Sequence, residues 1–433
     1  MNSPDTDARK TSPHETRNAL SNEWHARPLL SLPAPLRCTH LVRLRSDLRI
    51  DERRDEFAVI CRDQGQAEPA HGSRHHAIQA GHCLLKWEGH TEADAYTLLV
   101  SGNSEPPFGT TALSFLDESV RTTLQRELFV GVQVEVVPCS DSDGEQRQER
   151  ARALLGTREI YGGSVSELRG EIWSSFRLDG EGFVRLLLMD CGMGEARVAR
   201  NLQRLLEIES YRMLAMLALP AARDVMATLG QLEPELDEVM AELARKTSPT
   251  QEALLERLSD IAARAEHLAA VNAYRFAAAR AYQGIVDKRL AELAEAKIAS
   301  APRYTTFLQK SLLPAMRTCD AAERRTRELA QRVTRATQLL NSMVDLDQKK
   351  QNQAILESMA ERANLQLRLQ QSVEGFSIFA ITYYAVGLVG YLLKSAKSLG
   401  APVDPTLLTG ISAPIVLAVV WLSVRRVKKH ITR

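Results

Sequence analysis

The most apolar part of the chain lies near its C-terminus. No charged residue occurs over the 18 positions from Phe376 to Leu393, and residues 406–424 form a second uncharged run. Each run approaches the ~20 residues that cross ~30 Å of hydrocarbon. The segment between them, KSAKSLGAPVDP, contains a glycine and two prolines that break a helix. The pattern predicts a transmembrane hairpin over residues 376–424, with spans 376–393 and 406–424.

The charges around this hairpin predict its orientation. The tail 425–433, RRVKKHITR, carries five Lys/Arg in nine residues, whereas the loop between the spans holds two lysines and one aspartate. Basic flanks remain on the cytoplasmic side, and two crossings return the chain to that side. We therefore expect both termini in the cytoplasm. A hairpin buried in a soluble bundle is the alternative, and the aromatics Tyr383, Tyr384, Tyr391 and Trp421 favour the membrane.

A long helix leads into the first span. Residues 321–371 contain neither glycine nor proline and are rich in strong helix formers. The apolar positions Leu329, Val333, Ala336, Leu340 and Met343 follow the 4-3-4-3 spacing of a coiled coil. We predict a stalk helix over 319–375 that continues to Leu393. Its apolar seam needs a partner, either from the same chain or from other copies in a homo-oligomer.

The remaining chain divides into two parts. Residues 193–318 contain three amphipathic helical stretches and form a predicted helical bundle. Residues 21–192 mix alternating β-branched runs with helical stretches, which indicates an α/β domain and an α+β fold class overall. We expect disorder in residues 1–20 and a charged loop at 141–150. Strands are predicted at 39–46, 83–90, 95–102, 130–138, 166–178 and 182–190.

Composition narrows the possible functions. The 433 residues carry a net charge of +1, which gives no general attraction to nucleic acid. The six cysteines form no C-x-x-C pair, so we expect neither a disulfide framework nor a structural zinc site, and a reducing cytoplasmic setting. The polar N-terminus has no apolar segment typical of a signal peptide.

One stretch is rich in potential metal ligands. It contains His71, His75, His76, His82, Cys83, His90 and Glu92. Such side chains bind transition metals, but a glycine separates the first two histidines and the region resembles a loop before a strand. Solvated loop histidines are the favoured interpretation, and the metal content stays unknown.

Four segments carry a resemblance to known families: NEWHARP (22–28), LLKWEGHTE (84–92), LLEIESYRMLAMLALP (205–220) and QLRLQQSVEGFSIFAITYYAVGLVGYL (366–392). They resemble a bacterial membrane-anchored family grouped as domain of unknown function 3422, which implies the bacterial inner membrane as the location. The architecture also resembles CorA-type divalent-cation channels. Those place a Gly-Met-Asn motif after the first span, where this chain reads Gly390-Tyr391-Leu392.

The family-like segments supply candidate site residues. His25, Arg27, Lys86, His90 and Glu92 could bind a small anionic ligand, or they could dock the NEWHARP turn against the sheet. The CGMGEA segment (191–196) fits a strand-to-helix turn better than a phosphate loop. Because no catalytic motif occurs, we expect no enzyme and no cofactor.

Polar residues near the first span define a possible pore. Glu374, Thr382 and Tyr384 could line a pore in an oligomer, because polar groups in a bilayer prefer protein or water neighbours. The leading hypothesis is an oligomeric CorA-like transport protein for an ion, lacking the Gly-Met-Asn motif. The alternative is a membrane-anchored sensor or scaffold without transport activity, and an anchored enzyme is the least favoured.

Overall fold

The structure is a computed structural model that describes residues 17, 33–45, 49–139, 143–245, 250–298, 301–399 and 404–431, without the side chains of residues 374, 397 and 427–431. The chain divides into two compact units, Met1–Arg335 and Ala336–Arg433. Most of the predicted disordered segment, residues 1–20, lies outside the described residues. The fold is α+β, with one mixed sheet and several long helices.

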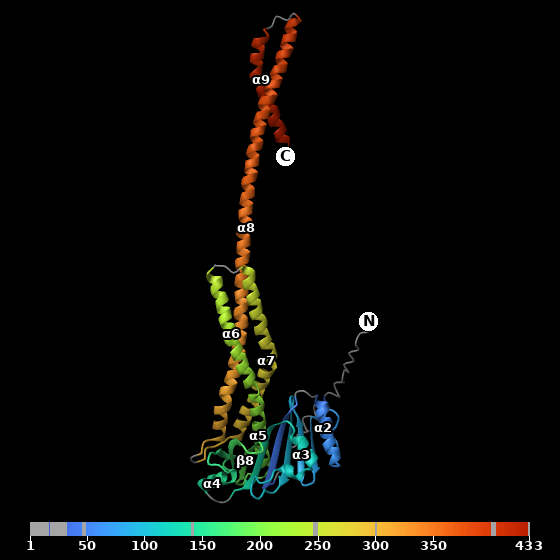
Figure 1. The fold of residues 1–433 in the computed structure, drawn as a ribbon, viewed down its shortest axis with the longest axis vertical. Helices are drawn as coiled ribbons and strands as arrows, with labels where there is room; N and C mark the ends of the chain where they lie inside the picture. The colour runs from blue at the N-terminus through green and yellow to red at the C-terminus, as the bar shows by residue number, and fades with distance from the viewer. Residues whose placement is uncertain are drawn as a thin grey trace. The chain divides into compact units, whose positions relative to one another are not determined.

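The first unit contains an eight-stranded sheet with the order β2-β3-β4-β1-β5-β8-β7-β6 (Figure 1). Among the described strands, β5 and β8 form the one parallel pair, and the other neighbours are antiparallel. The strands are β1 (Leu36–Leu44), β2 (His75–Ala80), β3 (Cys83–Gly89), β4 (Ala93–Ser101), β5 (Leu128–Pro138), β6 (Tyr161–Val165), β7 (Gly170–Leu178) and β8 (Phe183–Asp190).

Side-chain alternation divides the sheet between two sets of helices. One face packs on α2, η1, α3 and α4, with Leu41, Trp87 and Tyr96 buried beside Phe57 of α2. The other face meets α5, because successive strand residues point to opposite sides of a sheet. The helices of the first face are α2 (Ile50–Asp63), η1 (Ala112–Phe115), α3 (Glu118–Gln125) and α4 (Gly144–Leu155).

The six predicted strands are confirmed, although their ends shift by a few residues. Two elements contradict the predictions. The expected charged loop at 141–150 is largely helix α4, whose first turn is capped by the Asp143 carboxylate. His75 and His76, expected in a loop, lie in strand β2, an edge strand in which three of the six residues are polar.

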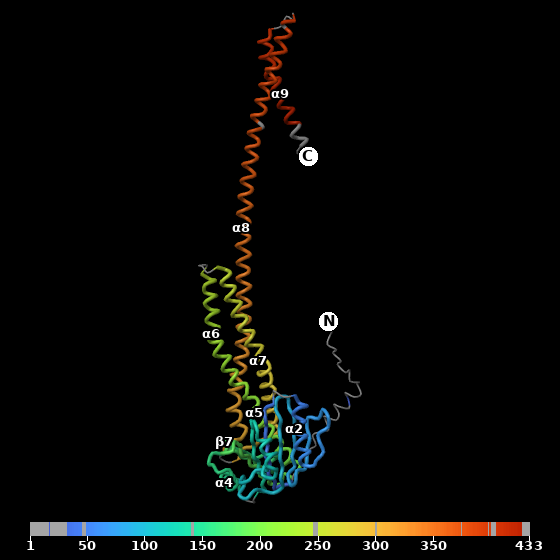
Figure 2. Tube along the Cα trace, turned by 45° about the vertical axis from the view of Figure 1, so that its right-hand side comes forward, coloured from blue at the N-terminus to red at the C-terminus, as the bar shows by residue number. Residues whose placement is uncertain are grey.

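Four helices build the rest of the first unit: α5 (Glu195–Met216), α6 (Ala218–Arg245), α7 (Gln251–Leu293) and the first part of α8 (Tyr304–Ser398). Helices α5 and α6 follow one another end to end, α7 runs alongside both, and the first part of α8 lies beside them (Figure 2). On α6, Leu229, Leu232 and Leu236 are buried at spacings of three and four residues, as expected for a helix that packs along one face. An ion pair of 2.6 Å between Arg325 and Glu233 joins α8 to α6.

The long helix begins earlier than predicted. It starts at Tyr304 rather than near Cys319 and runs through Pro314. A proline removes one backbone donor from a helix, and the buried side chains of Leu312 and Met316 on either side provide packing that holds the helix together. The last predicted helix is confirmed and extended, since α9 covers Pro405–Ile431.

The cysteines also differ from the expectation. Cys139 and Cys191 form a disulfide, with 4.8 Å between their Cα atoms. Cysteine spacing did not indicate this pair, because 52 residues separate its members and β-sheet pairing alone brings them together. The other four cysteines are free and buried.

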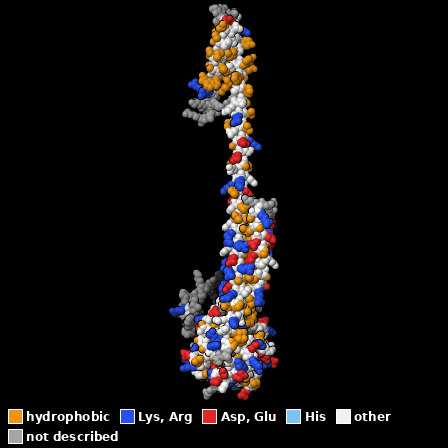
Figure 3. All heavy atoms as spheres, turned by 90° about the vertical axis from the view of Figure 1, so that its left-hand side faces the viewer, with side chains coloured by type: hydrophobic (Ala, Val, Ile, Leu, Met, Phe, Trp, Pro, Cys, Tyr) orange, Lys and Arg blue, Asp and Glu red, His pale blue; other side chains and the backbone are white. Residues whose placement is uncertain are grey.

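The second unit consists of the end of α8 and α9. Its apolar side chains are largely exposed, including Phe376, Phe379, Leu388 and Leu407, and Figure 3 shows hydrophobic side chains gathered over the hairpin. Three helical segments are long and apolar enough to cross a membrane by length and composition: Glu195–Arg245, Tyr304–Ala396 and Pro405–Arg426. A third of the apolar window in the first segment is buried, against 6% and 0% in the other two.

Candidate functional site

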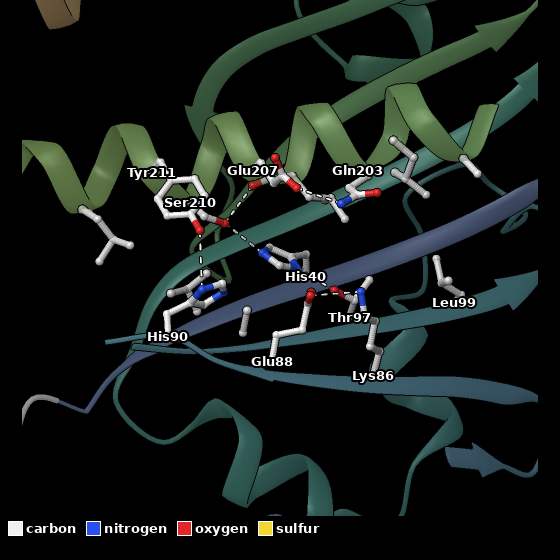
Figure 4. Close-up of a pocket in the computed structure, with 16 residues that line it drawn as sticks. His40, Lys86, Glu88, His90, Thr97, Leu99, Gln203, Glu207, Ser210 and Tyr211 are labelled. Atoms are coloured by element: carbon white, nitrogen blue, oxygen red, sulfur yellow. Dashed lines mark hydrogen bonds and ion pairs between the residues drawn. The ribbon is translucent and has the colours of Figure 1, made fainter. Parts of the chain in front are cut away.

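A cavity of about 90 Å³ lies between the sheet and helix α5 (Figure 4). Strands β1, β3 and β4 supply one wall, because every second residue of each strand faces the helix. Helix α5 supplies the other wall from residues spaced three and four apart. The lining residues are His40, Val42, Lys86, Glu88, His90, Ala95, Thr97, Leu99, Ala199, Leu202, Gln203, Leu206, Glu207, Ser210, Tyr211 and Leu214.

His40 of β1 lines this cavity and is itself buried. Its Nδ1 atom is 2.9 Å from the Thr97 hydroxyl, and its Nε2 atom is 2.9 Å from the Ser210 hydroxyl. Ser210 donates its own proton to the Leu206 carbonyl at 2.7 Å, so it accepts from Nε2–H, and Thr97 donates to Nδ1. Burial lowers the pKa of His40 to about 4, and Lys86 and His90 add to this effect while Glu88 opposes it. His40 is therefore neutral at pH 7.

The other polar residues of the cavity are arranged in pairs. Lys86 and Glu88, two residues apart on the same face of β3, form an ion pair of 3.1 Å. The Tyr211 hydroxyl lies 3.4 Å from Nδ1 of His90. Glu207 accepts from Arg289 of α7. The lining thus holds one lysine and two glutamates, and the second carboxylate, Glu207, is compensated by Arg289, which lies outside the lining.

Glu92, a predicted site residue, lies outside this cavity. It is buried, and its carboxylate accepts from Arg275 at 3.1 Å and from the Tyr282 hydroxyl at 2.9 Å, both on α7. Tyr282 in turn stacks on Tyr211 with ring centroids 5.5 Å apart. Glu92 therefore positions the β3–β4 turn against α7, and with it His90 in the cavity.

Residues on the opposite face of the sheet also hold this turn. Arg53 of α2 donates to the His90 carbonyl at 2.7 Å and forms an ion pair of 3.3 Å with the buried Asp94. Burial raises the pKa of Asp94 to about 6, although Arg53, Trp87, Arg45 and Arg43 lower it. His90 thus contacts Tyr211 of α5, and Glu92 contacts α7. Asp94 contacts α2 through its ion pair with Arg53.

A family described as "Protein of unknown function (DUF3422)" matches residues 12–431. The chain belongs to the DUF3422 family. No curated protein matches the chain. The DUF3422 match confirms the resemblance inferred from the sequence segments, and neither comparison supports the resemblance to CorA-type channels.

The structure brings together two of the predicted ligand-binding residues of the DUF3422 chain. Lys86 and His90 line the cavity, whereas Glu92 supports the turn behind it. His25 and Arg27 lie outside the described residues. The sequence reasoning missed His40, Glu88, Ser210 and Tyr211. A signal existed for some of them, since polar residues alternate with apolar ones in β3, and Ser210 and Tyr211 lie in a segment that carried the family resemblance.

The histidine-rich stretch of the DUF3422 chain forms no metal site in the part of the chain that the structure describes, where no group of three suitable ligands occurs. His75 and His76 point to opposite faces of β2, as neighbours in a strand do. The His76 ring is 2.8 Å from the Ala67 carbonyl, and Cys83 is buried in the core.

The predicted pore residues of the DUF3422 chain lie on α8. Thr382 donates to the carbonyl of Ile378 in its own helix at 2.6 Å, and the Tyr384 side chain is exposed. The side chain of Glu374 lies outside the described residues. An apolar groove of about 410 Å³ between α8 and α9 is lined by other residues, including Phe379, Leu417 and Trp421.

Proposed function

We propose that the chain is a membrane-anchored binding protein whose α/β domain takes a small uncharged or zwitterionic molecule into the His40 cavity. The observation that carries this proposal is that each Lys and Glu side chain of the lining has an oppositely charged partner and lies beside apolar residues of β4 and α5. Lys86 is matched by Glu88, Glu207 is matched by Arg289, and His40 is neutral.

The chemistry of the walls defines the ligand class. A bare cation or anion would leave one charge of the Lys86–Glu88 pair without compensation, which is costly in a half-buried site. A zwitterion can place its anionic group at Lys86 and its cationic group at Glu88. Leu99, Leu202 and Leu206 supply an apolar surface for the rest of the molecule.

The small volume supports the same class. The cavity holds about 90 Å³, below the ~300 Å³ at which pockets for drug-sized ligands begin. This volume fits a compact metabolite better than a peptide or a nucleotide. We assign no reaction to the cavity, because the Ser210 hydroxyl donates to a helix carbonyl rather than to His40.

The anchor is the α8–α9 hairpin. Its exposed apolar side chains, such as Phe376 and Phe379, would be costly in water and stable in lipid. The basic tail after Val424 supports a topology in which both termini lie on the cytoplasmic side of a bacterial inner membrane. The segment Glu195–Arg245 belongs to the soluble part in this proposal, because α5 and α6 bury their apolar faces against the sheet and the bundle.

Two experiments test the anchor. An alkaline carbonate wash should leave the protein in the membrane pellet. Alkaline phosphatase fused after Arg433 should be inactive, since this reporter needs the periplasm. Release by carbonate or an active reporter would refute the proposed topology.

A thermal-shift screen tests the cavity. Purified protein is heated with free amino acids as zwitterions, with their amides as cations and with the matching carboxylic acids as anions. We expect a zwitterion to raise the melting temperature by about 2 °C or more, as binding to the native state alone does. Lys86→Met and Glu88→Gln should remove this response, whereas Lys310→Met, at an exposed site on α8, should retain it. A response restricted to the anions, or one unaffected by the two cavity variants, would contradict the proposal.

A second candidate is an oligomeric, CorA-like transport protein. The observation in its favour is the exposure of Tyr383 and Tyr384, at 78% and 76%, on the first proposed span. Phenolic hydroxyls at this depth favour protein or water neighbours, which other copies could supply. A ring-forming oligomer in detergent and ion flux in liposomes that falls in Thr382→Leu and Glu374→Ala would support transport. A monomer that shows no ion flux would rule out transport and retain the proposal of a membrane-anchored binding protein.

A further inference from the structure

Cys139 and Cys191 are adjacent because of the parallel pairing of β5 and β8. Pro138 and Asp190 are register partners at the carboxyl ends of the two strands. The residues that follow them, Cys139 and Cys191, therefore lie at the same edge of the sheet. The Cys139 amide donates to the Asp190 carbonyl at 2.8 Å, and the Cα atoms of the two cysteines are 4.8 Å apart. This separation is suited to a disulfide.

The sheet does not depend on the bond between these cysteines. Strands β5 and β8 are paired over eight register positions, from Gly131 with Phe183 to Pro138 with Asp190. Val134, Leu186 and Leu188 are buried within this pair of strands. Hydrogen bonds and apolar burial therefore hold the strands together in either state of the cysteines.

The other cysteines differ from this pair in accessibility. Cys38, Cys61, Cys83 and Cys319 are buried, and burial raises the pKa of each thiol, to about 11 for Cys61 and Cys83. A buried thiol that is protonated at pH 7 reacts slowly, because the thiolate is the reactive form. Cys139 and Cys191 are only partly buried, so reagents reach this pair first among the six cysteines of the chain.

The pair also lies at the entrance to α5. Cys191 begins the turn Cys191–Gly194, and Gly194 is the N-cap of α5. The Asp190 carboxylate accepts from the amides of Gly192 at 3.0 Å and Met193 at 2.6 Å, which shapes the turn. The bond to Cys139 thus ties this turn to β5, next to the helix that forms one wall of the cavity.

We propose that Cys139 and Cys191 form a reversible thiol–disulfide exchange site that takes low-molecular-weight thiols as its reaction partners. Disulfides in a reducing compartment are usually transient and redox-active, which fits the cytoplasmic location proposed above. The exchange chemistry is a property of the pair itself and does not require a ligand in the cavity.

The exchange balances with two thiols. The thiolate of one thiol molecule attacks a sulfur of the Cys139–Cys191 bond, which forms a mixed disulfide and releases the other cysteine as a thiolate that takes a proton. A second thiol attacks the mixed disulfide and releases the remaining cysteine. The protein gains two protons and two electrons, and the two thiol molecules become one disulfide. The reverse reaction uses that small disulfide as the oxidant.

The test uses the purified full-length chain in detergent, equilibrated with glutathione at different ratios of reduced to oxidised form. Free thiols are trapped with a maleimide and counted by intact mass spectrometry. We expect two fast-labelling thiols in excess reduced glutathione and none in excess oxidised glutathione, with four more only after denaturation. Circular dichroism should stay unchanged between the two states.

Variants separate this site from the buried thiols. Cys139→Ser and Cys191→Ser should each leave one accessible thiol that captures a single glutathione, whereas Cys319→Ala should retain the two-thiol response. Two results would overturn the inference: a disulfide that resists reduction until the protein unfolds, or a pair that stays as two thiols in excess oxidised glutathione. Neither result bears on the thermal-shift screen, so a failure of this inference is distinguishable from a failure of the proposed ligand binding in the cavity.

Discussion

The Tyr282 hydroxyl donates a 2.9 Å hydrogen bond to the buried carboxylate of Glu92. The two residues come from α7 and from the β3–β4 turn, 190 positions apart. Arg275 adds an ion pair of 2.9 Å to the same carboxylate. Helix α7 therefore fixes the turn that carries His90, and the cavity depends on contacts outside its own walls.

Removing these contacts should destabilise the first unit. Glu92→Gln is expected to lower the free energy of unfolding by about 2 kcal/mol, because Arg275 loses its charged partner. Tyr282→Phe should cost about 1 kcal/mol, because it removes one hydrogen bond and retains the stacking on Tyr211. Urea titration followed by tryptophan fluorescence measures both, since Trp87 and Trp173 are buried in the sheet.

The double variant provides the control for this pair. If the Tyr282 hydroxyl acts through Glu92, the two losses should not add in the combined variant, and the coupling energy should be about 0.5 kcal/mol or more. Fully additive losses would contradict a direct link between the two residues.

His40 should give the protein a pH-dependent contribution to stability. Its pKa in the folded state is about 4, against 6.5 ordinarily, because burial disfavours the charged ring. The unfolded chain binds the proton first, so this contribution is fully present above pH 6.5 and is lost as pH falls towards 4. At about 1.4 kcal/mol for each pH unit in this window, the loss reaches about 3 kcal/mol.

The measurement compares the wild type with His40→Gln, which keeps a polar side chain but does not titrate. Unfolding free energies between pH 4 and 7 should show a difference between the two proteins that changes by about 3 kcal/mol in the stated direction. A difference that is constant with pH would show that His40 is not buried as a neutral ring.

Asp94 should act in the opposite direction. Burial raises its pKa to about 6 in the folded state, from 3.8, despite the neighbouring Arg53. Its contribution to stability is therefore present below pH 3.8 and is lost as pH rises to 6. Asp94→Asn resembles the protonated carboxyl group, so its stability relative to wild type should improve by about 3 kcal/mol across this window. Chemical denaturation at pH 4, 5 and 6 checks this, and a relative decline of the variant would refute it.

Gly163 offers a test of packing between β6 and the segment after α7. Ser164 and Ala296 pair their backbones, and a Cβ atom at Gly163 would lie 2.7 Å from the Ala296 carbonyl oxygen. Gly163→Ala should therefore cost about 1–3 kcal/mol in unfolding free energy. Gly180→Ala, at a site with no atom within 4 Å of the new methyl group, is the matched control and should change stability by less than about 1 kcal/mol.

The sequence predicts the parts of this fold that have a local cause. Strand β3 alternates buried and half-buried residues, and the period-two pattern is visible in CLLKWEG. Strand β2 and helix α4 were missed for the same physical reason, since neither has a strong apolar pattern and both are held by tertiary contacts. The start of α8 was missed because packing around Pro314 outweighs the local effect of a proline.

The candidate site was predictable only in part. Lys86 and His90 lie in one short segment, so a sequence reading can select them together. His40 meets Thr97 across 57 positions and Ser210 across 170, and no local pattern records either contact. The disulfide partners likewise come together only through the pairing of β5 with β8.

The parallel pairing of β5 and β8 has a consequence for how the protein reaches its native state. The strands on either side of the β5–β8 pair, β2-β3-β4-β1-β5 and β8-β7-β6, are antiparallel neighbours. Several of them are joined by short turns that close rapidly. Joining the two sides requires the chain between Pro138 and Phe183 to loop back, which costs more entropy than closing a hairpin. The two half-sheets should form early, and their union should limit the folding rate of the whole sheet.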